Sequence, residues 1–499
     1  MGDLCGLTLV QATDKLRRGE ISSVELTEAF IKKIEGNRKL NAFITETFDV
    51  ALRQAKQSDA KLCAARASSK NSAASSSSTS VGKLEGAPLG IKDLFCTKGI
   101  RTTAGSKILE NFVPPYESTV TQNLLDEGAV FLGKTNMDEF AMGSSNITSY
   151  YGNVISPIRS TKFPEKDLVP GGSSGGSSAA VAAHMVLAAT ASDTGGSIRQ
   201  PASFTGTVGI KPTYGLCSRY GMMALASSLD QAGPIARDVR DAALMLSVMA
   251  SFDPKDSTSV PRPRTDYLAD LTPSKTKGLK VGLPIECFEN LSEELSNVMQ
   301  NNIEILKGLG AEFFDVSLKN LKYALPVYYI IQPAEASSNL ARYDGVRYGV
   351  RAENARDLSE MYTKTRSEGF GREVRRRIFN GTFVLSKGGY DSYYVTAQKV
   401  LQCIQNDFCE AFKRVDVLFL PTTTGGAFGI EEGANMSPID MYLNDIFTVS
   451  VNLAGLPGIS VNGGFSSDGL PLGVQFVGQK FSEQRLLNIA GTIEEAHAH

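Results

Sequence analysis

Two segments rich in glycine and serine contain the residues with the clearest catalytic potential. One runs from Gly171 to Ser178, and the other, from Ser192 to Arg199, has paired glycines directly before Ser197. Paired glycines allow a tight turn whose backbone N–H groups converge on one point. Such a point beside a serine hydroxyl can serve as an oxyanion hole next to a nucleophile. Composition alone also permits two structural turns, or an anion-binding loop at the first segment.

A serine nucleophile needs a base, and histidine is nearly absent. His497 and His499 lie at the C-terminus, and His184 falls within an Ala-rich stretch that is predicted to be helical, where a packed histidine is expected. Lys92 is the leading candidate because it follows the apolar run Ala87–Ile91. Burial disfavours an ammonium, and a lysine whose pKa is lowered to about 7–8 can accept a proton.

Other kinds of site fit these residues less well. A P-loop has a lysine and a serine or threonine after its glycines, and no lysine follows the run 171–178. Residues 195–199 read Gly-Gly-Ser-Ile-Arg, which is not a G-x-S-x-G nucleophile elbow. The seven cysteines form no C-x-x-C pair, so we expect no metal site and a reducing compartment.

Composition limits the class of protein. The chain has 499 residues, of which 42% are hydrophobic, and a formal charge of −2. This balance suits a globular protein and argues against a basic nucleic-acid-binding surface. The sequence contains no apolar run of about 18 residues, so we expect no membrane span. The N-terminus does not have the pattern of a secretion signal. We expect a protein that is not secreted, located in a bacterial-type cytoplasm or an organellar matrix.

The elements that position these residues follow from hydrophobic patterning. Residues 7–62 are predicted to be helical, and one helix follows the capping box formed by Ser22 and Glu25. Alternating strands and helices favour an α/β sheet with helices on both faces. The predicted strands are Ala87–Ile91, Ala129–Leu132, Gly278–Leu283, Val415–Leu420, Ile459–Val461 and Gly473–Val477, and the predicted helices include Thr119–Glu127, Ser177–Ala188 and Glu293–Leu309.

We interpret residues 1–499 as a single domain. Residues 68–80 contain eight serines in thirteen positions, which predicts a flexible surface insertion. A linker is the other interpretation, but the preceding segment is short for a core of its own. Residues 256–275 are rich in proline, serine and aspartate and predict a loop.

Three motifs together resemble the amidase signature family. They are Gly90-Ile91-Lys92-Asp93, the Gly171–Ser178 run and Asp193-Thr194-Gly195-Gly196-Ser197, and Ser197 follows Ser173 by 24 residues. The resemblance implies an α/β/α layered fold with a central mixed β-sheet. It also implies a triad in which Ser197 is the nucleophile, Ser173 the bridging serine after a cis peptide bond, and Lys92 the base. The implied oxyanion hole is the backbone of Thr194, Gly195 and Gly196.

Within this family the chain is similar, from about residue 5 to 490, to the glutamine-hydrolysing subunits of tRNA amidotransferases. The stretches that carry this similarity are Met137–Ser145, Glu368–Gly371, Glu373–Val374, Gly381–Phe383, Met441–Asp445 and Asn452–Gly458. The departures are the 68–80 insertion and a longer loop at 156–170.

A glutaminase must hold the α-carboxylate and the α-ammonium of a free amino acid. A guanidinium suits the first group because it pairs with a carboxylate through two hydrogen bonds, and a carboxylate suits the second. The cluster Arg375-Arg376-Arg377 and Asp445 supply these charges. Following the resemblance, we predict Arg377 and Asp445 as substrate-binding residues, with Tyr328 lining the site. The arginines could instead form a solvated helix face or a partner or tRNA contact.

The resemblance also implies partners. Ammonia would pass to a B subunit that uses ATP and Mg²⁺ to activate and amidate Glu-tRNA(Gln), and a small C subunit would complete a heterotrimer. No cofactor is expected in this chain, tRNA would bind mainly to the B subunit, and Asp-tRNA(Asn) is an additional possible substrate. Two alternatives stay open: a free-standing amidase acting on a small acyl or aryl amide, and a non-catalytic scaffold or phosphate-binding module.

Overall fold

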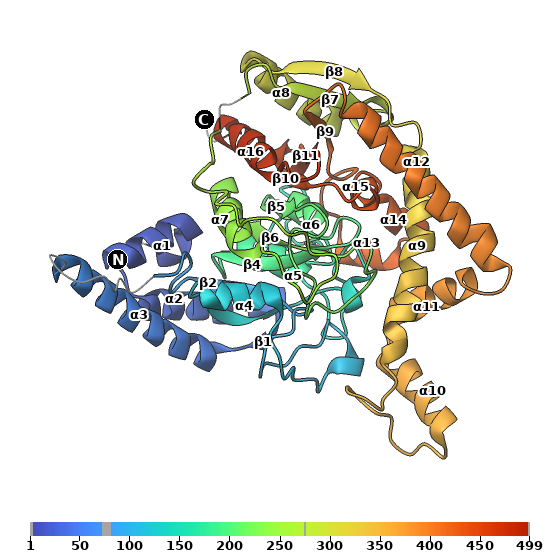
Figure 1. The fold of residues 1–499 in the computed structure, drawn as a ribbon, viewed down its shortest axis with the longest axis horizontal. Coiled ribbons are helices and arrows are strands. Elements are labelled where there is room, and N and C mark those ends of the chain that lie inside the picture. Colours follow the sequence, from blue (N-terminus) through green and yellow to red (C-terminus); the bar gives the residue numbers. More distant parts are fainter. Residues whose placement is uncertain (1–2, 72–80, 274–275, 498–499) are drawn as a thin grey trace.

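The central feature of the fold is one large mixed sheet. The computed structural model describes residues 3–71, 81–273 and 276–497, and eleven strands within them form a sheet in the order β1-β3-β2-β4-β6-β5-β10-β11-β9-β7-β8 (Figure 1). The strands are β1 (Phe43–Glu46), β2 (Pro88–Lys92), β3 (Val130–Thr135), β4 (Ala188–Asp193), β5 (Val208–Lys211), β6 (Gln231–Ala236), β7 (Lys280–Pro284), β8 (Glu312–Val316), β9 (Val417–Pro421), β10 (Gly458–Phe465) and β11 (Pro471–Gly478).

Parallel and antiparallel pairs occupy different parts of this sheet. β2 is parallel to both β3 and β4, and β7 is parallel to both β8 and β9. The strands between these two groups, from β4 through β6, β5, β10 and β11 to β9, pair antiparallel. The expected central mixed sheet is therefore confirmed, and the C-terminal half of the chain extends the same sheet.

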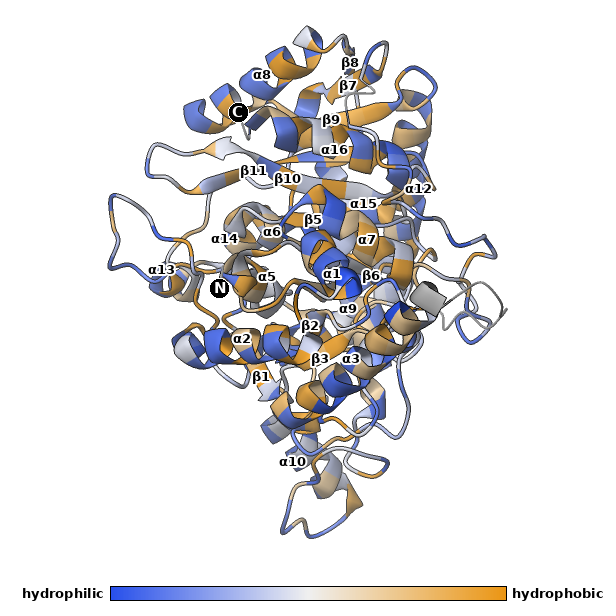
Figure 2. Ribbon diagram, turned by 90° about the vertical axis from the view of Figure 1, so that its left-hand side faces the viewer, coloured by the Kyte–Doolittle hydropathy of each residue, from blue (hydrophilic) through white to orange (hydrophobic). Residues whose placement is uncertain are grey.

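Helices cover both faces of the sheet (Figure 1). Helices α7 and α16 contact each other and pack on the central strands from one side, and α5 and α6 do so from the other. Outer helices such as α2 and α8 alternate polar and apolar residues (Figure 2), as expected for helices with one buried face. The helices are α1 (Leu9–Arg18), α2 (Ser23–Gly36), α3 (Phe48–Asn71), α4 (Thr119–Asp126), α5 (Gly175–Ala182), α6 (Arg199–Thr205), α7 (Val239–Met249), α8 (Glu293–Gly308), α9 (Ala324–Asn339), α10 (Leu358–Gly369), α11 (Arg372–Val384), α12 (Thr396–Ala411), α13 (Ile430–Asn435), α14 (Pro438–Leu443), α15 (Val449–Leu453) and α16 (Glu483–His497).

The N-terminal region is partly as predicted. Ser22 caps α2 through the backbone N–H of Glu25, and the Glu25 side chain accepts a bond from the Ser22 N–H, so the capping box is confirmed. The prediction of helices throughout 7–62 was wrong at β1, which pairs with β3. Helix α3 continues to Asn71, so the first residues of the 68–80 segment are helical rather than irregular. Residues 72–80 lie outside the described part of the chain.

The Ala-rich stretch folds differently from the prediction. Helix α5 ends at Ala182, and the chain enters β4 at Ala188. His184 therefore lies in the turn between them, with a φ of 56°, and its Nδ1 is 3.2 Å from the Cys5 carbonyl oxygen. Alanine has a high helix propensity, but tertiary context overrides propensity. Here residues 183–187 form the turn that leads into the fully buried strand β4, so only the first part of the stretch is helical.

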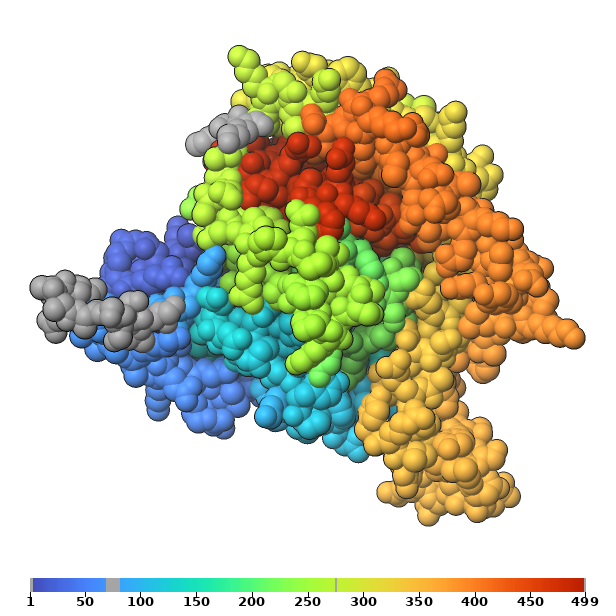
Figure 3. Space-filling view, viewed as in Figure 1, coloured from blue at the N-terminus to red at the C-terminus, as the bar shows by residue number. Residues whose placement is uncertain are grey.

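The packing of helices α9 and α11 positions Arg377, one of the predicted binding residues. The segment containing α10 stands out from the body of the molecule (Figure 3), and α11 returns from it to pack against α9. A Cβ at Gly381 would lie 1.9 Å from the Pro333 carbonyl oxygen, so glycine is required for this close approach. The crossing sets Arg377 beside Gln332 of α9.

A bilayer-crossing helix requires about 20 apolar residues. None of the helices within residues 3–71, 81–273 and 276–497 meets that requirement.

Asp241 of α7 holds the first turn of helix α1 through two hydrogen bonds. Its carboxylate oxygens accept the N–H groups of Leu9 and Val10 at 2.7 and 2.9 Å, and Asp241 is fully buried. We expect Asp241→Ala to loosen α1, because losing the partner of a buried N–H group costs about 1–3 kcal/mol. Hydrogen exchange of residues 9–18 should become faster, whereas Asp14→Ala, an exposed change on the same helix, should leave it unchanged. Equal exchange in both variants would contradict this account.

Candidate active site

The sheet brings two of the predicted catalytic segments to one edge. Lys92 ends β2 and Asp193 ends β4, and these strands are parallel with Leu89 paired to Ala188. Because parallel strands end at the same edge, the loop that contains Ser197 begins beside Lys92. The Gly171–Ser178 run reaches the same place because its first half leads into α5, which packs on β2 and β4.

Lys92 is enclosed by hydroxyl groups. Its side chain is 0% exposed, and Nζ lies 2.8 Å from Ser173 Oγ, 2.7 Å from Ser174 Oγ and 2.8 Å from Ser192 Oγ. An ammonium has three protons to donate and accepts nothing. A neutral amine has two protons and one lone pair, so it can donate to two of these hydroxyls and accept from the third. The three contacts therefore suit either protonation state.

Burial lowers the pKa of Lys92. Desolvation of the ammonium outweighs the opposing charges of Asp138, Asp193 and Asp230 and brings the pKa to about 7. No carboxylate of the described residues forms an ion pair with Lys92 that would restore the ordinary value of 10.5. A large fraction of the amine is therefore neutral at neutral pH, as a general base requires.

Ser173 and Ser197 differ in their surroundings. Ser173 is 0% exposed and follows a cis peptide bond with Gly172, whereas Ser197 is 8% exposed. Within the described residues the Ser197 hydroxyl has no hydrogen-bonding partner, and in particular none in Ser173. The structure thus joins Lys92 to Ser173 and places Ser197 in the neighbouring loop. The catalytic roles of the three residues stay predictions.

The loop before Ser197 is held at both ends. The Thr194 hydroxyl donates to Asp230 Oδ1 at 2.7 Å, and the Ile198 N–H donates to Asp193 Oδ2 at 3.2 Å. Between these points Gly196 has a φ of 145°, a backbone conformation that favours glycine. This arrangement suits the predicted oxyanion hole, because it fixes the direction of the loop's N–H groups before a substrate arrives.

A buried ion pair stabilises the same loop. Arg199 donates to both carboxylate oxygens of Asp193 at 3.0 Å, and both residues are 0% exposed. Burial alone would raise the pKa of Asp193, but the Arg199 guanidinium outweighs it and the pKa falls to about 2. Because Arg199 also donates to Asn452 and Gln475, all parts of the pair are hydrogen-bonded.

Arg377 is a buried, oriented cation rather than part of a solvated helix face. Its Nε donates to Glu373 Oε1 at 2.7 Å and its Nη1 to Gln332 Oε1 at 2.8 Å. The guanidinium lies over the rings of Tyr329 and Tyr442, at 5.4 and 5.8 Å from their centroids. Nη2 is the remaining nitrogen and has no hydrogen-bonding partner among the described residues.

Asp445 and Tyr328 lie against the glycines of the loop that contains Ser197. Asp445 Oδ2 accepts a 2.5 Å hydrogen bond from the Ser144 hydroxyl, and burial raises the pKa of Asp445 to about 7. Tyr328 packs against Gly195, since a Cβ there would lie 2.7 Å from the tyrosine Oη. The pKa shift of Asp445 includes a contribution from Arg377, so the two predicted binding charges interact electrostatically.

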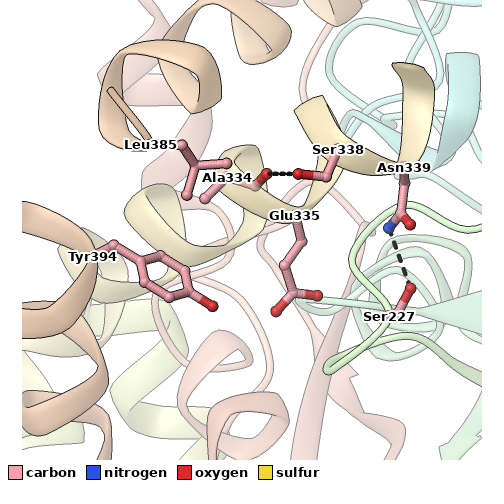
Figure 4. A pocket seen from close by; sticks show the side chains of 7 residues that line it. All are labelled: Ser227, Ala334, Glu335, Ser338, Asn339, Leu385 and Tyr394. Carbon is pink, nitrogen blue, oxygen red and sulfur yellow. Dashed lines mark hydrogen bonds between the residues drawn. The ribbon is translucent and has the colours of Figure 1, made fainter. Parts of the chain in front are cut away.

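A cavity of about 430 Å³ adjoins this region and is lined among others by Ser144, Glu373, Arg377 and Tyr442. This volume suits a small molecule. Asp445, Tyr328 and Ser197 are not among the residues that line this cavity. A separate, smaller pocket of about 230 Å³ lies between α9 and the loop at Ser227, where Asn339 donates to the Ser227 hydroxyl at 3.2 Å (Figure 4). That second pocket contains none of the predicted site residues.

Sequence reasoning missed several members of the site. Ser174 and Ser192, which contact Lys92, were not among the predicted site residues, although both lie in the two segments rich in glycine and serine. Ser144, Gln332 and Glu373 orient Asp445 or Arg377 from distant parts of the chain. Ser144 and Glu373 lie in the stretches that carry the family resemblance, which was the available signal for them.

Comparison with known proteins defines the class. Residues 25–487 match the family described as Amidase, and this chain belongs to that family.

Individual proteins and solved structures resemble this chain over almost its whole length. The A subunit of glutamyl-tRNA(Gln) amidotransferase from Parvibaculum lavamentivorans is 58% identical over 497 residues, which cover 99% of this chain and 97% of that protein. The crystal structure of the protein of the same name from Thermotoga maritima is 39% identical, has a TM-score of 0.78 and covers 99% of this chain and 96% of that one. A peptide amidase from Stenotrophomonas maltophilia is 29% identical, with a TM-score of 0.79, over 98% and 97% of the two chains.

The geometry predicts which serine reacts with an electrophile and when. A fluorophosphonate should label Ser197, because Ser197 is partly exposed, whereas the fully buried Ser173 should stay unlabelled. The labelling rate should fall as the pH drops below about 7, because protonated Lys92 cannot accept a proton. Peptide mass spectrometry identifies the labelled residue.

Lys92→Arg is the matched variant for this labelling experiment, since guanidinium keeps its proton. It should react at a rate that does not change between pH 6 and 9 and that is far below that of the wild type. Undiminished labelling in Lys92→Arg would show that another base operates.

Proposed function

We propose that this chain hydrolyses glutamine as the A subunit of a glutamyl-tRNA(Gln) amidotransferase and supplies the ammonia that converts Glu-tRNA(Gln) to Gln-tRNA(Gln). The observation that carries the proposal is a buried, partly neutral amine in the same region as an oriented guanidinium and a buried carboxyl group. Arg377, which lines the cavity, and Asp445, whose carboxyl group accepts a hydrogen bond from the cavity-lining Ser144, match the α-carboxylate and the α-ammonium of a free amino acid. The 58% identity to a protein of that name supports the same function.

Substrate binding follows from the groups left unpaired. Arg377 Nη2 is available to the α-carboxylate, and the stacked rings of Tyr329 and Tyr442 hold the guanidinium in place. Asp445 Oδ1 is available to the α-ammonium because Ser144 occupies Oδ2. The side-chain carboxamide of glutamine then extends toward Ser197, past Tyr328 and Gly195.

Acylation begins with proton transfer through Ser173. Neutral Lys92 accepts the Ser173 proton as Ser173 accepts that of Ser197, and Ser197 Oγ attacks the carboxamide carbon. Backbone N–H groups of the 194–197 loop stabilise the oxyanion. The ammonium of Lys92 then returns its proton through Ser173 to the departing nitrogen, so that ammonia leaves and an ester to Ser197 remains.

Deacylation uses the same groups in the same order. A water gives one proton through Ser173 to Lys92 and attacks the ester carbon. The proton then passes back to Ser197 Oγ as the ester bond breaks, which releases glutamate and regenerates the neutral amine.

The remaining chemistry belongs to partners. The proposed enzyme has several different chains, and we propose B and C subunits that complete a heterotrimer with this one. ATP and Mg²⁺ serve the B subunit, which also holds most of the tRNA, and Asp-tRNA(Asn) is an additional candidate substrate. This chain requires no cofactor for the steps above. A bacterial-type cytoplasm or an organellar matrix is the compartment we propose.

A free-standing amidase is the weaker alternative. Such an enzyme would share Lys92, Ser173 and Ser197 but would have no need for Arg377 and Asp445 to hold a free amino acid. The oriented Arg377 and the lower 29% identity to a peptide amidase both disfavour it.

Ser197→Ala should abolish amidation that uses glutamine as the nitrogen source and leave amidation that uses ammonium intact. In a complex purified with its native partners, glutamine-dependent amidation of Glu-tRNA(Gln) should be lost because no acyl-enzyme can form. Amidation with added ammonium chloride should continue at the wild-type rate, which also shows that the complex is intact. Survival of glutamine-dependent activity would mean that the nucleophile is misassigned.

Arg377→Ala should weaken glutamine binding. Losing a charged hydrogen bond of about 1.5–3 kcal/mol corresponds to a KM about 10- to 100-fold higher, with a smaller change in kcat. Arg375→Ala is the matched control, since Arg375 is exposed on the same helix. Steady-state glutaminase kinetics measure both, and an unchanged KM in Arg377→Ala would move the carboxylate site elsewhere.

A further inference from the structure

One side chain connects the turn after Asp445 to the loop before Ser197. Thr448 Oγ1 lies 2.6 Å from the carbonyl oxygen of Gly195 and 3.0 Å from that of Asp445. The Asp445 carbonyl already accepts the N–H groups of Thr448 and Val449, at 3.0 and 3.1 Å. A hydroxyl has a single proton to donate, so the shorter contact, to Gly195, is the one that it serves.

Thr448 is buried and belongs to the hydrogen-bond network around Arg199. The residue is 0% exposed, and its own carbonyl oxygen accepts a hydrogen bond from Arg199 Nη2 at 3.2 Å. Arg199 is in turn fixed by Asp193 at the start of the Ser197 loop. Arg199 thus supports the Thr448 end of the turn, whereas at the Asp445 end one carboxylate oxygen has no hydrogen-bonding partner among the described residues.

The contact sets the direction of a predicted oxyanion-hole donor. In a trans peptide the C=O and N–H groups point in opposite directions, and Gly195–Gly196 is trans. When Thr448 holds the Gly195 carbonyl, the Gly196 N–H points away from Thr448. Rotation of this peptide would turn the donor away from the position where negative charge develops.

The α-ammonium site adjoins the same peptide. A Cβ at Gly196 would lie 2.3 Å from Thr448 Oγ1 and 3.4 Å from Asp445 Oδ1. The hydroxyl, the free carboxylate oxygen and the oxyanion-hole peptide thus meet at one point. Asp445 and Thr448 belong to one backbone turn, closed by the Thr448 N–H to the Asp445 carbonyl.

We propose that Thr448 is a positioning residue that couples recognition of the substrate's α-ammonium at Asp445 to the orientation of the Gly195–Gly196 peptide. The inference rests on the proposed glutaminase function. An ammonium bound to Asp445 fixes the 445–448 turn, and the fixed turn keeps the hydroxyl on Gly195. An amide without an α-ammonium leaves the turn less fixed and loses transition-state stabilisation in addition to binding.

Two variants of the purified native complex test the hydroxyl. Thr448→Val keeps the shape and removes the donor, whereas Thr448→Ser keeps the donor. Because removal of an oxyanion-hole donor costs about 10²–10³ in kcat, a donor left misoriented should cost about 10- to 100-fold in the kcat for glutamine. KM should change little, and Thr448→Ser should restore the kcat. Ammonium-dependent amidation should be unaffected in both variants.

A substrate analogue tests the coupling. Glutaric acid monoamide is glutamine without its α-amino group, so it cannot engage Asp445. Thr448→Val should lower kcat/KM for this analogue by a smaller factor than for glutamine. Equal factors for the two substrates, or a Thr448→Val enzyme as active as the wild type, would overturn the proposal. A wild-type complex that does not hydrolyse glutamine would instead reject the proposed function, on which the inference depends.

Discussion

The proposed chemistry depends on Lys92, which is buried without an ion-pair partner among the described residues. Lys92 has three hydroxyl neighbours, and each carboxylate that could neutralise it is engaged by other groups. Arg199 binds Asp193, Asp230 accepts the Thr194 hydroxyl, and Asp138 accepts the Thr148 hydroxyl. Desolvation therefore dominates and favours the neutral amine. A single direct ion pair at this point would restore the ammonium and remove the base.

The site has two parts that differ in the groups they contain. On the lysine side, hydroxyl groups surround an amine that must lose its proton. On the other side, the Arg377 guanidinium and the Asp445 carboxyl group are buried and held by hydrogen bonds with Gln332, Glu373 and Ser144. The Ser197 loop begins beside Lys92 and contacts Tyr328 and Asp445 through Gly195 and Gly196, and the Asp193–Arg199 pair fixes it in place. Different residues of one small region thus serve substrate binding and proton transfer.

Much of this arrangement could be predicted from the sequence, and the limits have physical causes. Local patterns correctly predicted the α2 capping box and the strand that leads to Lys92, because caps and apolar runs are short-range features. The same reasoning placed His184 in a helix, because alanine alone does not indicate where a buried strand begins. Contacts such as Ser144 to Asp445 and Thr448 to Gly195 join residues 301 and 253 positions apart. No local pattern specifies such contacts, and only the folded sheet brings these residues together.

A direct titration of the Lys92 side chain tests the central claim. In protein labelled with ¹⁵N-lysine, the Nζ resonance assigned by its loss in Lys92→Arg can be followed by NMR from pH 5 to 11. The account predicts a midpoint near 7. A midpoint near the ordinary lysine value of 10.5 would contradict it, because the amine would then be an ammonium throughout the pH range in which the protein is proposed to act.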